Sequence, residues 1–279
     1  MPSTVAGSRK GNIWRGAQDL WLEVFILFNL VCLTGDIVLA HSENAFRAWA
    51  EYIPVWFSPA AAVALAFCLF ARVRLGWRTV WADVGSLIAW ISIAVGAAGV
   101  IFHLESRFFY ERTLKSLTYA APFVAPLAYM GLGCLLLMNR MVDHRKKEWA
   151  QWVLFMALGG FAGNFVLSLT DHAQNGFFHW TEWIPVASSA FAVGFLLTLL
   201  FAKAGPRFLW LCAGVLIIQM FVGGLGFVLH GLADVHGPSP SSWENVIHGA
   251  PPFAPLLLPN LAILGLLGML AMEEHVGVE

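Results

Sequence analysis

The sequence predicts an all-α polytopic membrane protein with eight transmembrane helices. The helices form two parallel four-helix repeats, each made of two helical hairpins, and both termini are cytoplasmic. Hydrophobic residues make up 59% of the 279 residues and charged residues 12%, and the mean hydropathy is +0.71, far outside the averages of soluble globular domains. Apolar segments of roughly 20 residues recur, the length that a helix needs to cross about 30 Å of hydrocarbon. An internal repeat and an uneven distribution of basic residues complete the evidence for this fold class.

The apolar segments define the predicted spans and, with them, the organisation of the chain. In order, the spans are 19–40, 53–71, 82–103, 120–138, 151–170, 184–202, 207–229 and 253–272. Residues 1–18 are polar and lack an early apolar core, so we expect a retained cytoplasmic segment and no cleaved signal peptide. The predicted repeats are 19–140 and 141–272, and residues 273–279 form a cytoplasmic tail.

The basic residues predict the orientation. The connections after the even-numbered spans and the N-terminal segment contain most of them: Arg9, Lys10, Arg15, Arg72, Arg74, Arg78, Arg140, Arg145, Lys146, Lys147, Lys203 and Arg207. The opposite side has only Arg47, Arg107, Arg112 and Lys115. By the positive-inside rule, the histidine-rich loops face outward. We therefore expect a multi-pass protein of a bacterial-type cytoplasmic (inner) membrane.

The internal repeat follows from aligning the chain with itself. A shift of 131 positions places His41 on His172, Glu51 on Glu182 and Pro54 on Pro185. Slightly smaller shifts match the third and fourth spans with the seventh and eighth: Gly96, Gly99, His103, Pro122 and Pro126 correspond to Gly223, Gly226, His230, Pro251 and Pro255. Because each repeat has an even number of spans, both copies share one orientation, as parallel repeats do.

Four histidines close the four outward-running helices, and each has a carboxylate close in sequence. The histidines are His41, His103, His172 and His230, and the carboxylates are Glu43, Glu105, Asp171 and Asp234. Imidazole and carboxylate are common ligands of transition metals. Ionisable groups at membrane depth are costly and therefore suggest function. These eight residues are the predicted metal ligands, although solvated histidines at an interface would give the same pattern.

Two site chemistries fit the histidines. In the first, histidines of neighbouring helices ligate haem b, and the small Gly99 and Gly226 make room for the porphyrin. In the second, histidines and carboxylates bind a non-haem transition metal (Fe, Cu, Zn or Mn), with Glu105 as candidate general base. Glu51 and Glu182 lie three residues before a proline, so we expect them to complement a helix macrodipole.

The loops, the cysteines and the absence of nucleotide-binding motifs give further expectations about structure and function. The outward loops 42–52, 104–119, 171–183 and 230–250 are amphiphilic, which predicts short interfacial helices. The four cysteines lie in predicted spans without CxxC spacing and are expected to be small core residues. The chain contains neither a P-loop nor GxGxxG, which excludes ATP-driven transport by this chain alone. No feature indicates nucleic-acid binding.

The leading functional hypothesis is a membrane subunit of a redox or electron-transfer complex. Its outward histidines would hold haem b or a metal ion, and a quinone is a further candidate cofactor. The expected partners are the lipid bilayer and either other subunits of a membrane complex or a periplasmic protein. The alternatives are a membrane metalloenzyme acting on a lipid or small apolar substrate, a secondary transporter, and a non-catalytic structural or assembly subunit.

Overall fold

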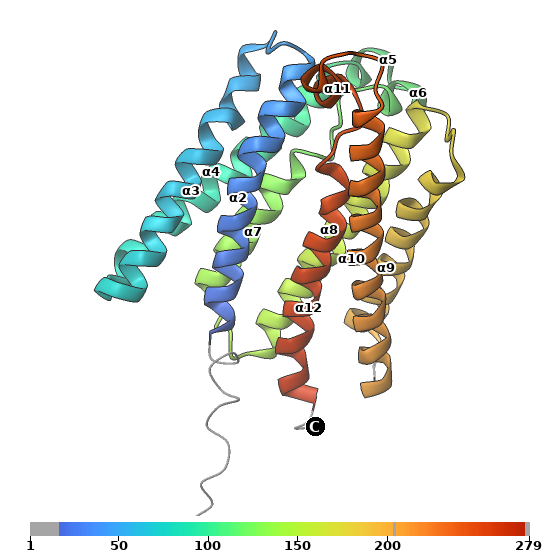
Figure 1. Cartoon of the computed structure of the whole chain (residues 1–279). Helices are drawn as coiled ribbons and strands as arrows, with labels where there is room; N and C mark the ends of the chain where they lie inside the picture. Colours follow the sequence, from blue (N-terminus) through green and yellow to red (C-terminus); the bar gives the residue numbers. More distant parts are fainter. Residues whose placement is uncertain (1–16, 203–204, 277–279) are drawn as a thin grey trace, which may run out of the picture.

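The computed structural model describes residues 17–202 and 205–276, and these residues form helices and turns without a β-strand. Seven helices in these ranges are long and apolar enough to cross a membrane (Figure 1). They are α2 (Gln18–Glu43), α3 (Tyr52–Phe70), α4 (Arg78–Glu105), α8 (Lys147–Gln174), α9 (Trp183–Phe201), α10 (Pro206–Val235) and α12 (Leu257–Val276). The prediction of a polytopic helical membrane protein is confirmed. Of the residues used to predict the orientation, Arg9, Lys10, Arg15 and Lys203 lie outside the described ranges, as do nearly all of segment 1–18 and the end of the 273–279 tail.

The fourth predicted span is shorter than expected. Helix α7 (Leu127–Met141) has 15 residues, and the chain before it forms turns instead of continuing the helix to residue 120. Pro122 and Pro126 explain the late start, because a proline inside a helix lacks the N–H for the bond to the carbonyl four residues earlier and collides with that carbonyl. The last span behaves in the same way: a 3₁₀ turn, η4 (Ala254–Leu256), precedes α12.

Short helices cover one end of the bundle, as the amphiphilic loops predict. They are η1 (Trp49–Glu51), α5 (Phe108–Glu111), α6 (Leu114–Thr118), η3 (Trp180–Glu182) and α11 (Ser242–His248). Figure 1 shows α5, α6 and α11 together where α2, α4, α8 and α10 end. We call this the histidine end. The opposite end, where the π-helical turn η2 (Ala71–Leu75) follows α3, is called the basic end.

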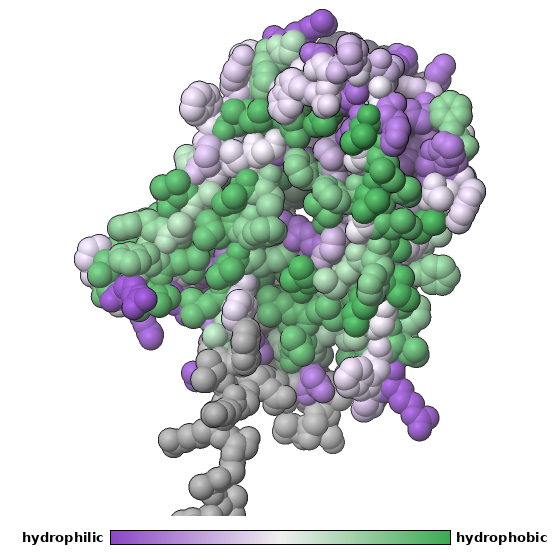
Figure 2. All heavy atoms as spheres, viewed as in Figure 1, coloured by the Kyte–Doolittle hydropathy of each residue, from purple (hydrophilic) through white to green (hydrophobic). Residues whose placement is uncertain are grey.

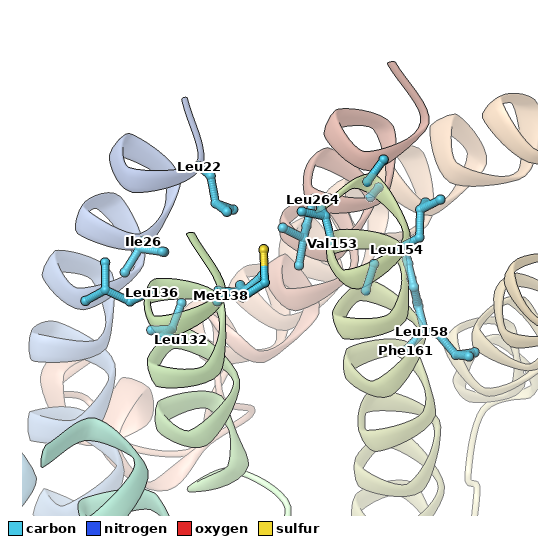
Figure 3. Close-up of a cluster of buried hydrophobic side chains, with 14 of the residues drawn as sticks. Leu22, Ile26, Leu132, Leu136, Met138, Val153, Leu154, Leu158, Phe161 and Leu264 are labelled. Carbon is cyan, nitrogen blue, oxygen red and sulfur yellow. The ribbon is translucent and has the colours of Figure 1, made fainter. Parts of the chain in front are cut away.

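The hydrophobic core lies where α2 meets α7 and where α8 meets α12 (Figure 3). Leu22 and Ile26 of α2 are at most 1% exposed, and so are Val153 and Ala157, their counterparts 131 positions later. Large apolar side chains also cover the outside, as the green surface in Figure 2 shows. Phe28 and Trp90, for example, are both 62% exposed. An apolar exterior of this extent fits a lipid bilayer, and the matched core positions are consistent with the predicted repeat.

A buried polar cluster occupies the basic end of the first half. Glu23 of α2 is fully buried and forms ion pairs with Arg140 of α7 and Arg72 of η2. The indole Nε1 of Trp81 donates to both Glu23 carboxylate oxygens at 2.9 Å, and Asn139 Nδ2 donates to Oε1 at 3.1 Å. We call these five residues the Glu23 cluster. Charge-assisted hydrogen bonds, which are stronger than neutral ones, connect α2, α4 and α7 in this cluster. The ion pair with Arg72 adds η2.

Candidate functional site

The structure brings the four predicted histidines together in two pairs, one in each half of the chain. His41, in the last turn of α2, lies beside His103, in the last turn of α4, with ring centroids 6.4 Å apart and the rings edge to face. In the second half, His172 of α8 interacts electrostatically with His230 of α10. The structure thus places His41 against His103 and brings His230 within electrostatic range of His172.

Each pair has a carboxylate, but it comes from the 3₁₀ turn that leads into the next helix. Glu51 of η1 interacts electrostatically with both His41 and His103. Glu182 of η3 places its Oε2 3.7 Å from Nδ1 of His172. We call His41, His103 and Glu51 the first cluster, and His172, His230 and Glu182 the second cluster.

The two glutamates share an unusual hydrogen-bonding state. One oxygen of each carboxylate has a donor: Oε1 of Glu51 accepts from Asn44 Nδ2 at 2.7 Å, and Oε1 of Glu182 accepts from the His179 N–H at 3.3 Å. The other oxygen, Oε2, is buried in both residues without a hydrogen-bond partner among the described residues. A buried carboxylate oxygen without a partner is costly, so each cluster offers an acceptor suited to a cation or a proton donor.

The carboxylates chosen from the sequence lie elsewhere. Glu43 and Glu105 are exposed, and within the described ranges neither forms a hydrogen bond or ion pair with a histidine. The candidate base Glu105 is thus not held at a histidine pair. Asp171 neighbours His172 in sequence but has no hydrogen bond of its own among the described residues. Asp234 is buried, and its Oδ1 accepts from the Ala250 N–H at 3.0 Å, which fixes the loop before α12.

A left-handed turn returns the chain so that each glutamate reaches its histidines. Ala45 and Phe46 after α2 have φ of 53° and 50°, and Gly176 and Phe177 after α8 have φ of 72° and 53°. The Phe46 N–H donates to the His41 carbonyl at 3.2 Å, and in the second half the Phe177 N–H donates to the His172 carbonyl at 3.1 Å. The phenyl rings consequently lie 6.2 and 6.1 Å from the imidazoles of His41 and His172.

The same turn gives a stability prediction. Ala45 has a left-handed backbone, whereas glycine occupies the matching position, Gly176. A left-handed conformation costs a residue with a Cβ about 1–2 kcal/mol. Glycine avoids this cost, but part of the gain is offset because glycine also makes the unfolded chain more flexible. We expect Ala45→Gly to raise the free energy of unfolding by about 0.5–1 kcal/mol and Gly176→Ala to lower it similarly, in detergent titrations followed by circular dichroism. Equal effects of both substitutions would contradict the turn geometry.

The histidines at the ends of α4 and α10 each contact the first proline of the pair that precedes the next helix. Pro126 and Pro255 have no N–H with which to bond the carbonyl four residues earlier, that of Pro122 or Pro251. Instead, Nδ1 of His103 lies 2.9 Å from the Pro122 carbonyl, and Nδ1 of His230 lies 2.8 Å from the Pro251 carbonyl. The Ala125 N–H also donates to the Pro122 carbonyl at 3.0 Å, and the Ala254 N–H donates to the Pro251 carbonyl at 3.3 Å. Each histidine is therefore a second donor to its carbonyl.

These bonds also fix the tautomer of the imidazoles. A carbonyl oxygen only accepts hydrogen bonds, so the proton lies on Nδ1 and Nε2 keeps its lone pair. His41 follows the same rule, with Nδ1 3.2 Å from the Ile37 carbonyl. An imidazole whose Nδ1–H is held by a backbone carbonyl is the usual arrangement of a metal-binding histidine. Three of the four clustered histidines thus present Nε2 for coordination.

The glycines near the histidines lie against the second proline of each pair. A Cβ added to Gly99 would lie 2.7 Å from Pro126 Cβ, and one added to Gly226 would lie 2.7 Å from Pro255 Cβ. The following helix therefore fills both faces and leaves no room for a porphyrin against them. Gly99 and Gly226 are packing residues, since small side chains permit close helix contact in membranes.

The clusters do not form a closed ligand cage. Within residues 17–202 and 205–276, no group of three or more His, Cys, Asp or Glu side chains is placed to hold a metal ion. Each cluster supplies two imidazoles and a nearby carboxylate that would have to move to complete a three-ligand set. No protein family, curated protein or solved structure shows a significant match to this chain. The clusters themselves must therefore support any functional argument.

Proposed function

We propose that this chain is the membrane subunit of a redox or electron-transfer complex and binds a transition metal at the two histidine clusters. The observation that carries the proposal is a pair of imidazoles in each half, three of which, those of His41, His103 and His230, have Nδ1 held by a backbone carbonyl. Neutral imidazole with a free Nε2 suits Fe, Cu and Zn, of which Fe and Cu change oxidation state. Two such clusters at one end of the bundle suit electron exchange with a partner at that end.

The carboxylates support a cation in the clusters. A metal ion brings positive charge into a region where uncompensated charge is expensive. The buried Oε2 of Glu51 and of Glu182, without hydrogen-bond donors among the described residues, supplies negative charge at the required place. Because Pro126 and Pro255 close the glycine faces, a bare metal ion fits the arrangement better than haem b.

The test is the metal content of the detergent-purified protein, with visible spectra recorded oxidised and dithionite-reduced. We expect about two ions per chain, and the loss of one in the variant His41→Ala/His103→Gln. Glutamine at 103 keeps an N–H donor for the Pro122 carbonyl, so the bundle should retain its melting temperature. Glu51→Gln should weaken the same site, because it removes the negative charge and preserves the shape.

The matched control is His236→Ala. His236 is an exposed histidine at the same end and has the same kind of bond as His41, with Nδ1 2.8 Å from the Leu232 carbonyl, but it lies outside both clusters. The control should keep both ions. Wild-type protein without stoichiometric metal and without a haem band would refute the proposal, as would full metal retention when all four clustered histidines are replaced.

A further inference from the structure

A cleft separates α2 from α12 at the junction of the two halves. Its volume is about 790 Å³, which lies in the range of small-molecule sites. Side chains of both helices line it, among them Trp21, Val24 and Phe28 of α2 and Pro259, Ile263 and Leu267 of α12. Figure 1 shows α2 and α12 side by side at the front of the bundle, and Figure 2 shows hydrophobic surface on both sides of the junction. The cleft is therefore open to lipid.

One polar feature interrupts the apolar lining. Asn260 of α12 lines the cleft and faces Asn29 of α2, and their side-chain amides bond to each other. Asn29 Nδ2 donates both to Asn260 Oδ1 at 3.1 Å and to the Phe25 carbonyl at 2.8 Å, which accounts for both of its hydrogens. Asn260 Nδ2 donates only to Asn29 Oδ1 among the described residues. The second N–H of the Asn260 amide therefore has no acceptor within residues 17–202 and 205–276.

The depth of this amide decides which ligands can reach it. Asn29 is the twelfth of the 26 residues of α2, so it lies about 21 Å from the histidine end of that helix at 1.5 Å per residue. A free N–H that faces lipid at this depth is costly. A phospholipid keeps its ester and phosphate oxygens at the membrane surface, and a packed helix uses its carbonyls internally. Neither supplies an acceptor here.

We propose that the cleft binds a quinone carried on an apolar tail. A ring carbonyl accepts the free N–H of Asn260, and the tail lies along the apolar side chains between α2 and α12. A quinone combines an uncharged acceptor with enough apolar surface to reach the middle of the membrane. The site is separate from the histidine clusters, and the inference does not depend on the metal proposal.

The test measures binding of a decyl-substituted benzoquinone to the full chain in lipid nanodiscs. The quinone that co-elutes with the discs is quantified, and the amount in protein-free discs is subtracted. We expect saturable binding of one quinone per chain. Ile263→Trp, which fills the cleft, should abolish saturation. Asn29→Leu/Asn260→Leu should weaken binding about fivefold, the usual effect of one neutral hydrogen bond. This double variant removes both amides together, so no unpaired amide remains in the membrane.

Two controls make the result specific. Leu225→Trp adds the same bulk on an exposed face of α10, away from the cleft, and should bind like the wild type. Decylbenzene has the tail without a carbonyl and should not displace the quinone. Non-saturable uptake, equal binding by the Ile263→Trp variant, an undiminished affinity without the asparagine pair, or displacement by decylbenzene would each overturn the proposal. The metal content should be unchanged throughout, which keeps the two proposals distinguishable.

Discussion

Replacing Glu23 with alanine is expected to destabilise the protein by about 3–5 kcal/mol, the usual cost of breaking a buried ion pair by removing one partner. Glu23 is fully buried and is the acceptor for Trp81 and Asn139 and the counter-ion of Arg140 and Arg72. Without it, two guanidinium groups remain in a largely dry environment with one nearby carboxylate, that of Asp19. Unfolding in detergent, monitored by circular dichroism, would measure the loss.

The second half of the chain offers a way to test whether unpaired buried charge causes the stability loss in Glu23→Ala. Its counterparts of Glu23 and Arg140 are Leu154 and Met269, and both are buried. The double variant Glu23→Leu/Arg140→Met reproduces this apolar arrangement, so it should recover much of the stability that Glu23→Ala loses. Asp83→Ala is the control, because Asp83 is an exposed carboxylate on α4. Equal effects of Glu23→Ala and Asp83→Ala would show that the Glu23 cluster contributes no stability.

The second large effect is expected at Gly223. A Cβ at this position would lie 2.3 Å from Pro259 Cδ and 2.6 Å from the Pro255 carbonyl oxygen, and a backbone atom cannot move aside as a flexible side chain can. Gly223→Ala should therefore separate α10 from α12 and cost about 1–3 kcal/mol, typical of overpacking. It should also weaken the His230 bond to Pro251 by displacing the start of α12.

The adjacent glycine provides the matched control. A Cβ added to Gly224 would meet nothing within 4 Å. Gly224→Ala should be neutral or stabilise the protein by up to about 1 kcal/mol, because alanine favours helix more than glycine does. Thermal unfolding of the two variants side by side would measure the difference. If Gly224→Ala destabilises the protein as much as Gly223→Ala does, the close approach of α10 and α12 is not the cause of the stability loss in Gly223→Ala.

Much of the fold was predictable because long apolar segments and the prolines are local signals. The seven long helices and the short helices of the histidine end follow from them. The start of α7 was not placed correctly, since hydropathy alone cannot show that Pro122 and Pro126 prevent a helix. The cysteines fit only partly: Cys68 and Cys212 are buried, whereas Cys32 is exposed.

The histidines of the site were predictable, but its carboxylates were not. Neighbourhood in sequence favoured Glu43 and Glu105, yet a helix end directs adjacent residues to different faces. The internal repeat contained the better signal, because Glu51 and Glu182 match each other, whereas Gln174 is the counterpart of Glu43 and Leu232 that of Glu105.

The Glu23 cluster escaped prediction for a related reason. Arg72 and Arg140 resemble ordinary basic residues flanking a membrane helix, and only the folded structure shows that both reach Glu23. An ion pair between side chains more than 40 positions apart produces no recognisable local pattern in a single sequence. The asparagine pair between α2 and α12 is a second example, because its two members lie in different halves.

The shortness of α7 has a consequence for the membrane itself. Its 15 residues extend only about 22 Å, some 8 Å less than a typical hydrocarbon layer. Nearly half of its side chains are buried among neighbouring helices, so the lipid need not thin to match it. Irregular backbone at this depth persists where protein or a water-filled cavity surrounds it. Protein surrounds the turns at 119–126, because Ala120 and Val124 are buried and the Ala121 N–H donates to Ser106 Oγ at 3.0 Å. Neighbouring helices therefore complete the crossing that α7 leaves short.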